Sequence, residues 1–228
     1  MAAPRVALFA DTSHEVNGAA RTCREWHAFA ERRSLPLLCV RWGSAPHLSP
    51  PGPVRTLDLV RSVCAFPVDP DLKFDPCFYR DVEPVAAVLE SFRPDIVHVT
   101  SPGDLGILGA ILAARRKTRL TLSWHTNLHE FVARRVAKLL SWAPSSRYGS
   151  LARAVERFVM DRVCWFFGRG EMIFAPNPEL IALLHARTGK PVFPMGRGVD
   201  TELFHPRKRS RTAFQPKSYL RLVFEAEA

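Results

Sequence analysis

Short apolar runs alternate along the chain with longer segments in which apolar residues recur every three or four positions. The short runs predict buried strands, and the longer segments predict helices with one apolar face. Strands separated by helical crossovers indicate a parallel sheet with helices on both faces. We therefore expect an α/β fold, a doubly wound Rossmann-like sheet. The predicted strands are residues 5–10, 35–42, 54–63, 95–100, 119–124, 171–175 and 192–195, and the predicted helices are 19–33, 85–92, 104–116, 128–167 with a break near 144–149, and 178–187.

The end of the chain departs from this rhythm. Residues 1–195 form the predicted Rossmann-like domain, and residues 196–217 are a turn-rich, basic connector. One more strand is predicted at 218–224, and a lone strand has no partner to pair with. We expect residues 218–228 to be a remnant of the first strand of a second, missing domain. The proline-rich and aspartate-rich stretch 66–76 is expected to be irregular.

Composition and charge exclude several classes of protein. The chain has 228 residues, of which 47% are hydrophobic and 24% charged, as in an ordinary globular protein. No apolar run approaches the roughly 20 residues that a membrane-spanning helix needs. The five cysteines form no Cys-x-x-Cys pair, which argues against a disulfide framework or zinc ribbon and favours a reducing cytoplasm. The net charge of +10 favours an anionic partner: a nucleic acid, an acidic membrane surface or a phosphorylated small molecule.

The first strand-to-helix turn is a candidate anion site. Asn17 and Gly18 directly precede the predicted helix, and a glycine there lets a phosphate approach N–H groups that the helix dipole already favours for anions. A plain tight turn with Asn17 as the helix N-cap explains the same residues equally well. The turn lacks the G-x-G-x-x-G pattern, so a dinucleotide site is only weakly supported.

A second candidate follows the strand at 119–124. His125 comes after its carboxyl end, where ligand-contacting side chains collect in open α/β sheets. With His129 it has the spacing of a helical metal pair, but no third ligand is evident and we predict no metal site. Asp69-Pro70-Asp71 has the Asp-x-Asp spacing of metal-dependent sugar transferases, yet its prolines favour an acidic surface turn. Neither a Gly-x-Ser-x-Gly elbow nor a P-loop occurs.

Residues 131–169 carry eight basic and two acidic side chains, a net charge of +6, interleaved with aromatic residues. Basic amphipathic stretches of this kind suit an anionic membrane interface. Helices whose aromatics pack on the sheet and whose arginines face water have the same composition. No recognised nucleic-acid-binding module is present, and we expect no nucleic-acid partner.

Three separated segments resemble retaining glycosyltransferases of family 4, which have the two-domain GT-B architecture: residues 11–22 (DTSHEVNGAART), 123–127 (SWHTN) and 196–206 (GRGVDTELFHP). The strand 95–98 (DIVH) and the Ser-Pro-Gly loop that follows it are also typical of that family. The resemblance covers about residues 4–224, and the connector is its most specific part. It implies an acceptor-side domain that faces a donor-binding domain across a cleft.

The resemblance also implies roles for particular residues. Asn17 and Gly18 lie beside the diphosphate of a nucleotide sugar, and His125 lies near the transferred sugar. The predicted residues are Asn17, Gly18, Arg197 and Gly198 for the donor, His125 for catalysis, and Ser101, Gly103 and Asp104 for the acceptor.

The implied reaction is the transfer of a mannose-like hexose from a GDP- or UDP-linked donor to a lipid or glycan acceptor at the cytoplasmic membrane face. It needs no metal and no cofactor. The Arg/Lys pair and the Glu-x7-Glu segment of the family's second domain do not occur in this sequence, so we expect the chain to be inactive by itself. Two alternatives remain: a non-catalytic lectin-like or membrane-docking module, or one subunit of a two-chain transferase.

Overall fold

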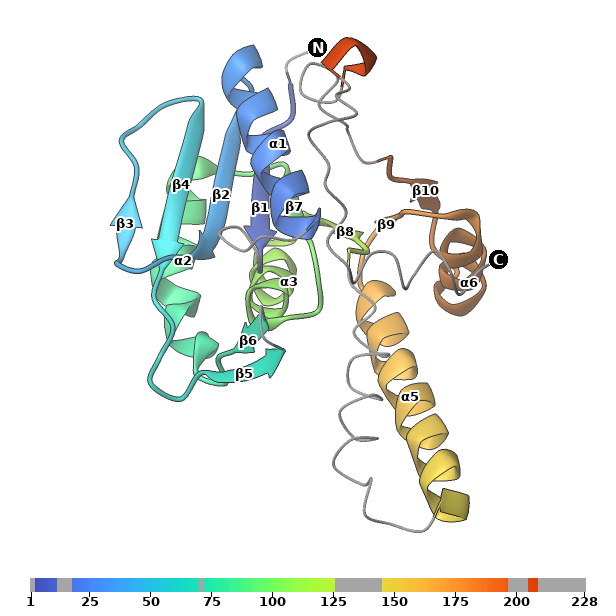
Figure 1. The fold of residues 1–228 in the computed structure, drawn as a ribbon. Helices are drawn as coiled ribbons and strands as arrows, with labels where there is room; N and C mark the ends of the chain where they lie inside the picture. Colours follow the sequence, from blue (N-terminus) through green and yellow to red (C-terminus); the bar gives the residue numbers. More distant parts are fainter. Residues whose placement is uncertain (1–2, 12–17, 70–71, 126–144, 197–204, 209–228) are drawn as a thin grey trace. The chain divides into compact units, whose positions relative to one another are not determined.

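A computed structural model describes residues 3–11, 18–69, 72–125, 145–196 and 205–208 (Figure 1). Contacts divide the chain into a large unit, residues 1–196, and a small one, residues 197–228. In the small unit, the described part is the single turn η2 (Pro206–Lys208). The predicted strand at 218–224 lies outside the described residues, and the predicted domain boundaries stay predictions. No helix among the described residues has both the length and the apolar character needed to cross a bilayer.

The large unit is built on a mainly parallel sheet, which confirms the predicted α/β class. Its eight strands lie in the order β10-β9-β8-β7-β1-β2-β4-β3, and β3 is antiparallel to β4. The strands are β1 (Val6–Ala10), β2 (Leu37–Trp42), β3 (His47–Leu48), β4 (Val54–Leu59), β7 (Ile96–Val99), β8 (Arg119–Ser123), β9 (Met172–Ala175) and β10 (Val192–Pro194). The helices are α1 (Gly18–Arg33), η1 (Phe78–Asp81), α2 (Val82–Phe92), α3 (Asp104–Arg116), α5 (Ser145–Phe167) and α6 (Pro178–Thr188).

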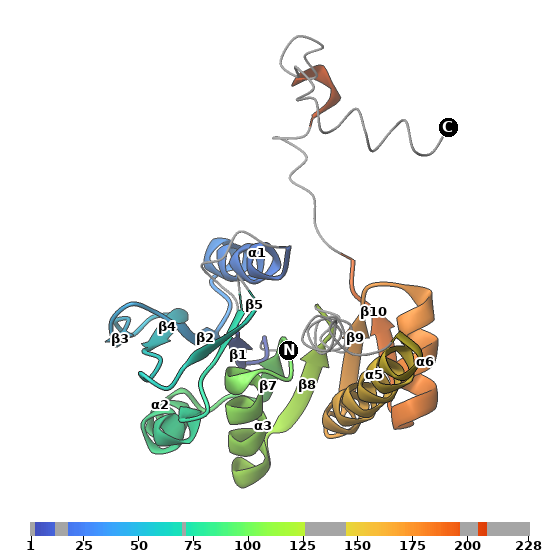
Figure 2. The same ribbon diagram turned by 60° about the horizontal axis from the view of Figure 1, so that its bottom comes forward.

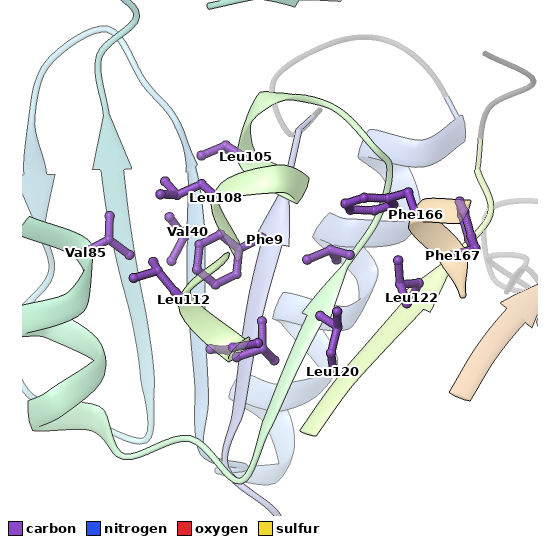
Figure 3. Packing of buried hydrophobic residues seen from close by; sticks show 14 of the residues in the cluster. Phe9, Val40, Val85, Leu105, Leu108, Leu112, Leu120, Leu122, Phe166 and Phe167 are labelled. Carbon is purple, nitrogen blue, oxygen red and sulfur yellow. The ribbon is translucent and has the colours of Figure 1, made fainter. Parts of the chain in front are cut away.

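Side chains of the central strands alternate between two apolar layers. Ala7 and Phe9 of β1 join the larger core with α2, α3, α5 and α6, whereas Leu8 and Ala10 join a smaller core with α1. Figure 2 shows α1 on one face of the sheet and α2 and α3 on the other. Helices therefore cover both faces, as predicted. Figure 3 shows how Phe9 lies among α3 leucines in the larger core.

Most predicted elements within the described residues agree with the structure, although the strand predicted at 54–63 ends at Leu59 and η1 was not predicted. Residues 128–144 of the predicted helix 128–167 lie outside the described residues. The prediction that residues 66–76 are irregular is wrong: β5 (Phe66–Asp69) and β6 (Leu72–Phe74) form an antiparallel pair in a separate two-stranded sheet. The paired rings of Phe66 and Phe74, 5.9 Å apart, stabilise it despite the prolines. The helix break predicted near 144–149 is wrong for its latter part, because α5 already begins at Ser145. The short strand β3 was not predicted.

Candidate functional site

The loops at the carboxyl ends of β1, β7 and β8 carry the described candidate residues. Parallel strands bring these ends to one edge of the sheet, where open α/β folds bind ligands. Gly18 is the exposed first residue of α1, so the N-terminus of that helix opens at this edge. His125 lies two residues beyond β8 and is half-buried. The structure thus provides a helix N-terminus and an imidazole, while Asn17, Arg197 and Gly198 lie outside the described residues.

His125 is held by the strand that precedes it. Its Nε2 lies 2.8 Å from the hydroxyl of Ser123, the last residue of β8. The same hydroxyl lies 2.9 Å from Nε2 of His98 on the neighbouring strand β7. His98 Nδ1 in turn lies 2.8 Å from the Thr121 hydroxyl. Two histidines and two hydroxyls therefore form a continuous hydrogen-bonded chain that ends at His125.

Within this hydrogen-bonded chain of side chains, the imidazole of His98 is neutral. It is 8% exposed, and burial, with a smaller contribution from His125, lowers its pKa to about 3. Near neutral pH it therefore presents one N–H donor and one acceptor nitrogen. A hydroxyl has a single proton, so Ser123 can donate to only one of the two imidazoles. The state of His98 consequently limits which tautomer of His125 the site stabilises.

Trp26 of α1 connects this chain to the helix that begins at Gly18. Its ring lies edge-on to His98 with centroids 5.4 Å apart, and edge-on to His125 at 5.8 Å. Trp26 also packs against the smaller apolar core. The indole therefore packs the middle of α1 against His98 and His125.

A buried carboxylate, Asp11, ties the end of β1 to the loop after β7. It accepts hydrogen bonds from the Ser101 hydroxyl and from the backbone N–H of Leu105, the latter at 2.9 Å. Burial, followed by the charge of Asp104, raises the pKa of Asp11 to about 7. Interaction with the Asp104 side chain adds to this upward shift of the Asp11 pKa, whereas the hydrogen bonds from Ser101 and Leu105 oppose it.

Asp104 was predicted to contact the acceptor, and the structure places it in the protein interior. It is 1% exposed. Its Oδ1 accepts from the Trp42 indole at 3.0 Å, and its Oδ2 accepts from the backbone N–H of Asp75 at 2.8 Å. Arg61 Nε lies 3.7 Å from the same Oδ2. These contacts join the ends of β2 and β6 to the first residue of α3.

The predicted acceptor residues Ser101 and Gly103 are half-buried and lie in the loop ahead of α3. A Cβ at Gly103 would lie 2.7 Å from Asp11 Oδ2, and one at Gly106 would lie 1.8 Å from the carbonyl oxygen of Ser101. Any larger residue at either position would push the loop away from the β1 end. The glycines are therefore required for the close packing of this loop.

The sequence reasoning missed several residues that build the site: Asp11, Trp26, Trp42, His98 and Ser123. A usable signal was present, since His98, Thr121 and Ser123 are polar positions inside otherwise apolar strands. Buried polar side chains need partners, and adjacent strands were the obvious source. Across the described ranges, no three His, Cys, Asp or Glu side chains gather as a metal site would require.

Comparison with known proteins identifies the family. The model of Glycosyltransferase Family 4 matches residues 16–203. The chain belongs to glycosyltransferase family 4. The match includes α1, the loop after β7, the β8 turn with His125, and the start of the connector.

Among curated proteins, this glycosyltransferase domain is 27% identical over 146 residues to a GDP-mannose-dependent alpha-mannosyltransferase from Corynebacterium glutamicum. The match covers 61% of this chain and 31% of that protein. Among solved structures, a sucrose-phosphate synthase from Thermosynechococcus elongatus is similar, with a TM-score of 0.53 and 13% identity. That likeness covers 89% of this chain and 50% of the synthase, and it supports the fold of one GT-B half. The chain therefore spans a third to a half of these proteins.

Proposed function

We propose that this family 4 domain is the acceptor-side half of a metal-independent, retaining transferase that moves a mannose-like hexose from a nucleotide sugar to a lipid or glycan acceptor. A GT-B enzyme of this kind closes a second domain over the donor. The reaction takes place at the cytoplasmic face of the membrane in this proposal.

The contacts that support the proposal hold His125 at the carboxyl edge of the sheet, where α1 begins: its ring lies against Trp26 in the middle of α1 and beside the Ser123 hydroxyl that also contacts His98. A helix N-terminus stabilises a diphosphate through its N–H groups and its dipole. Gly18, with Asn17, would meet that diphosphate without a side chain in the way. His125 would then lie near the transferred sugar, and Arg197 and Gly198 would contribute from the connector as the family resemblance implies.

In the proposed reaction, the protein mainly orients the reacting groups and stabilises the charge that develops. As the glycosidic bond to the diphosphate breaks, negative charge grows on the leaving group, and oriented donors lower the barrier because they need no reorganisation. A neutral His98 with a fixed Ser123 keeps the His125 ring in one orientation. Fixed orientation matters since small displacements of a positioning group cost large factors in rate.

The acceptor loop is assigned to Ser101 and Gly103, and Asp104 is reassigned. Its buried contacts with Trp42 and Asp75 support a positioning role beneath the loop instead of contact with the acceptor. For the donor, the name of the Corynebacterium glutamicum protein makes GDP-mannose the first candidate to test and UDP-linked sugars the second.

The experiment is a nuclear magnetic resonance titration of the 228-residue chain with GDP-mannose, UDP-glucose and ADP-ribose. We expect millimolar binding of a sugar nucleotide, roughly 4 kcal/mol, with shifts at the first amides of α1 and at His125. His125→Ala should weaken binding about tenfold, because a hydrogen bond to a charged ligand is lost. The control is His47→Ala, an exposed histidine on β3, which is the outermost strand of the sheet and lies five strands from β8; this variant should bind like the parent.

Thermal unfolding separates the two roles of His125. The His125→Ala protein should melt within a few degrees of the parent if the histidine serves the ligand. A melting temperature far below the parent, or shifts that avoid α1 and His125 altogether, would mean that the site is assigned to the wrong residues.

A further inference from the structure

A broad apolar groove of about 910 Å³ runs between α3 and α5, on the face of the sheet opposite α1. Its walls are Ile107, Ile111 and Ala114 of α3 and Val159, Val163 and Phe166 of α5. Pro102, which lies between the proposed acceptor residues Ser101 and Gly103, also lines it. The groove therefore continues to the loop that we assign to the acceptor.

Three cations border this groove: Lys117, Arg162 and Arg169. No carboxylate within ion-pair distance is present for them among the described residues, whereas Arg115, Arg116 and Arg187 nearby pair with Glu83, Glu90 and Asp161. Among the described residues that line the groove, Glu171 is the acidic one. The border therefore has a net positive charge of +2.

An exposed aromatic row lies along the same helix. Phe158 is 62% exposed and Trp165 is 56% exposed. Phe158, Arg162 and Trp165 fall four and three positions apart, which places these three on one side of α5, and Arg169 lies two residues beyond the end of the helix. The Arg162 guanidinium lies 5.5 Å from the centre of the Phe158 ring, and that of Arg169 lies 4.2 Å from the centre of Trp165. Stacked guanidinium groups keep their N–H donors available for phosphate oxygens.

We infer that this surface, named here the α3–α5 face and made of the groove with Phe158, Arg162, Trp165, Arg169 and Lys117, docks on an anionic phospholipid bilayer. Lipid phosphates would meet the unpaired cations, and the boundary of the hydrocarbon layer would meet Trp165 and Phe158. Tryptophan is enriched at that depth of a bilayer because its ring is amphipathic. Nucleic acid would use the cations but would leave the apolar groove uncovered. The docking does not depend on the proposed sugar transfer; it is linked to that proposal by Pro102 and by the proposed location of the reaction at the membrane face.

The test is co-sedimentation of the 228-residue chain with vesicles of neutral phosphatidylcholine, and with vesicles in which phosphatidylglycerol replaces a third of that lipid. We expect binding to the anionic vesicles alone, weakening as salt rises from 50 to 500 mM, since surface charges are screened. The variant Trp165→Ser/Arg169→Gln should bind at least tenfold more weakly, because one cation near the surface contributes about fivefold and the ring adds to it.

The matched control is Phe29→Ser/Arg33→Gln on α1. Phe29 is 48% exposed, and the Arg33 guanidinium lies 5.7 Å from the centre of its ring, so the change is chemically similar on the opposite face. This variant should bind within about twofold of the parent. Equal loss in both variants, or equal binding of the parent to neutral vesicles, would overturn the assignment of the surface.

Tryptophan fluorescence quenching tests the same surface if the double variant fails to fold. Brominated lipids quench tryptophans that enter the interface, and the quenching should disappear in Trp165→Phe. Quenching that persists in this variant would assign the contact to another face. No nucleotide sugar is present in either experiment. Failure here would therefore remove the membrane-face location from the proposed function but not the sugar transfer, and failure of the nucleotide titration would leave this surface assignment unchanged.

Discussion

His98 and His125 are joined through one hydroxyl group, that of Ser123, which lies 2.9 Å from Nε2 of the first and 2.8 Å from Nε2 of the second. The two histidines occupy different strand ends and are brought together because β7 and β8 are neighbours in the sheet. His98 is buried and neutral, and His125 lies half-buried beyond the carboxyl end of β8. The inner histidine is therefore a positioning residue for the outer one.

Replacement of His98 by phenylalanine should remove the constraint on the tautomer of the His125 ring. The ring would keep the volume but remove the contact with Ser123, so the Ser123 hydroxyl would become free to serve His125 in either direction. We expect the tautomer ratio and the pKa of His125 to change, measured by nitrogen chemical shifts. His98→Gln restores a polar partner and should recover the parent values in part. Unchanged His125 signals in His98→Phe would show that the hydroxyl chain does not position it.

His98 should also make the protein sensitive to acid. Its folded pKa, about 3, lies below the ordinary 6.5, so the unfolded chain binds a proton between these values while the folded chain does not. The free energy of unfolding due to this group therefore falls as the pH falls from 6.5 toward 3. Urea unfolding of the parent and of His98→Gln should give a difference that changes by about 2–3 kcal/mol between pH 6.5 and 4.5. A difference independent of pH would mean that His98 is charged or exposed in the folded protein.

Asp11 should give the free energy of unfolding a pH dependence opposite to that of His98. Its folded pKa of about 7 lies above the ordinary 3.8, so the folded chain keeps a proton that the unfolded chain has lost. The contribution of Asp11 to the free energy of unfolding therefore falls as the pH rises from about 4 to 7, and it stays constant above pH 7. Asp11→Asn, which keeps an N–H toward Asp104, should gain on the order of 1–3 kcal/mol relative to the parent between pH 4.5 and 7. Urea unfolding over the same pH series measures this gain, and a relative loss of stability over that range would contradict the raised pKa of Asp11.

Gly106→Ala should destabilise the protein strongly. The added methyl group would lie 1.8 Å from the Ser101 carbonyl oxygen, which is backbone and can move only if the loop after β7 moves. We expect a loss of about 3 kcal/mol or more in the free energy of unfolding. Gly52→Ala is the control, because its nearest neighbour would be at an ordinary 3.7 Å. Equal stability of the two variants would show that the loop packs less closely on the β1 end.

The sequence alone determined the order and type of most elements. The apolar runs and the three-to-four periodicity are local properties, so α3 was predicted with the bounds that the structure has, and the parallel sheet followed from the alternation. The same locality placed Gly18 and His125 after strands, hence at the ligand-binding edge. Where local signals conflicted, prediction failed: the prolines around Phe66 outweighed an alternation that the pairing with Phe74 makes favourable.

Only the tertiary structure decided which side chains meet at the candidate site. The bonds His98–Ser123, Trp42–Asp104 and Leu105–Asp11 span 25, 62 and 94 positions of the chain. Each depends on which strands are neighbours, and strand order is set by the packing of whole helices over both faces of the sheet. The local pattern around Asp104 is that of any polar residue at a helix start. It became a buried positioning group because β2 and β6 end beside it and supply the donors that its two oxygens need.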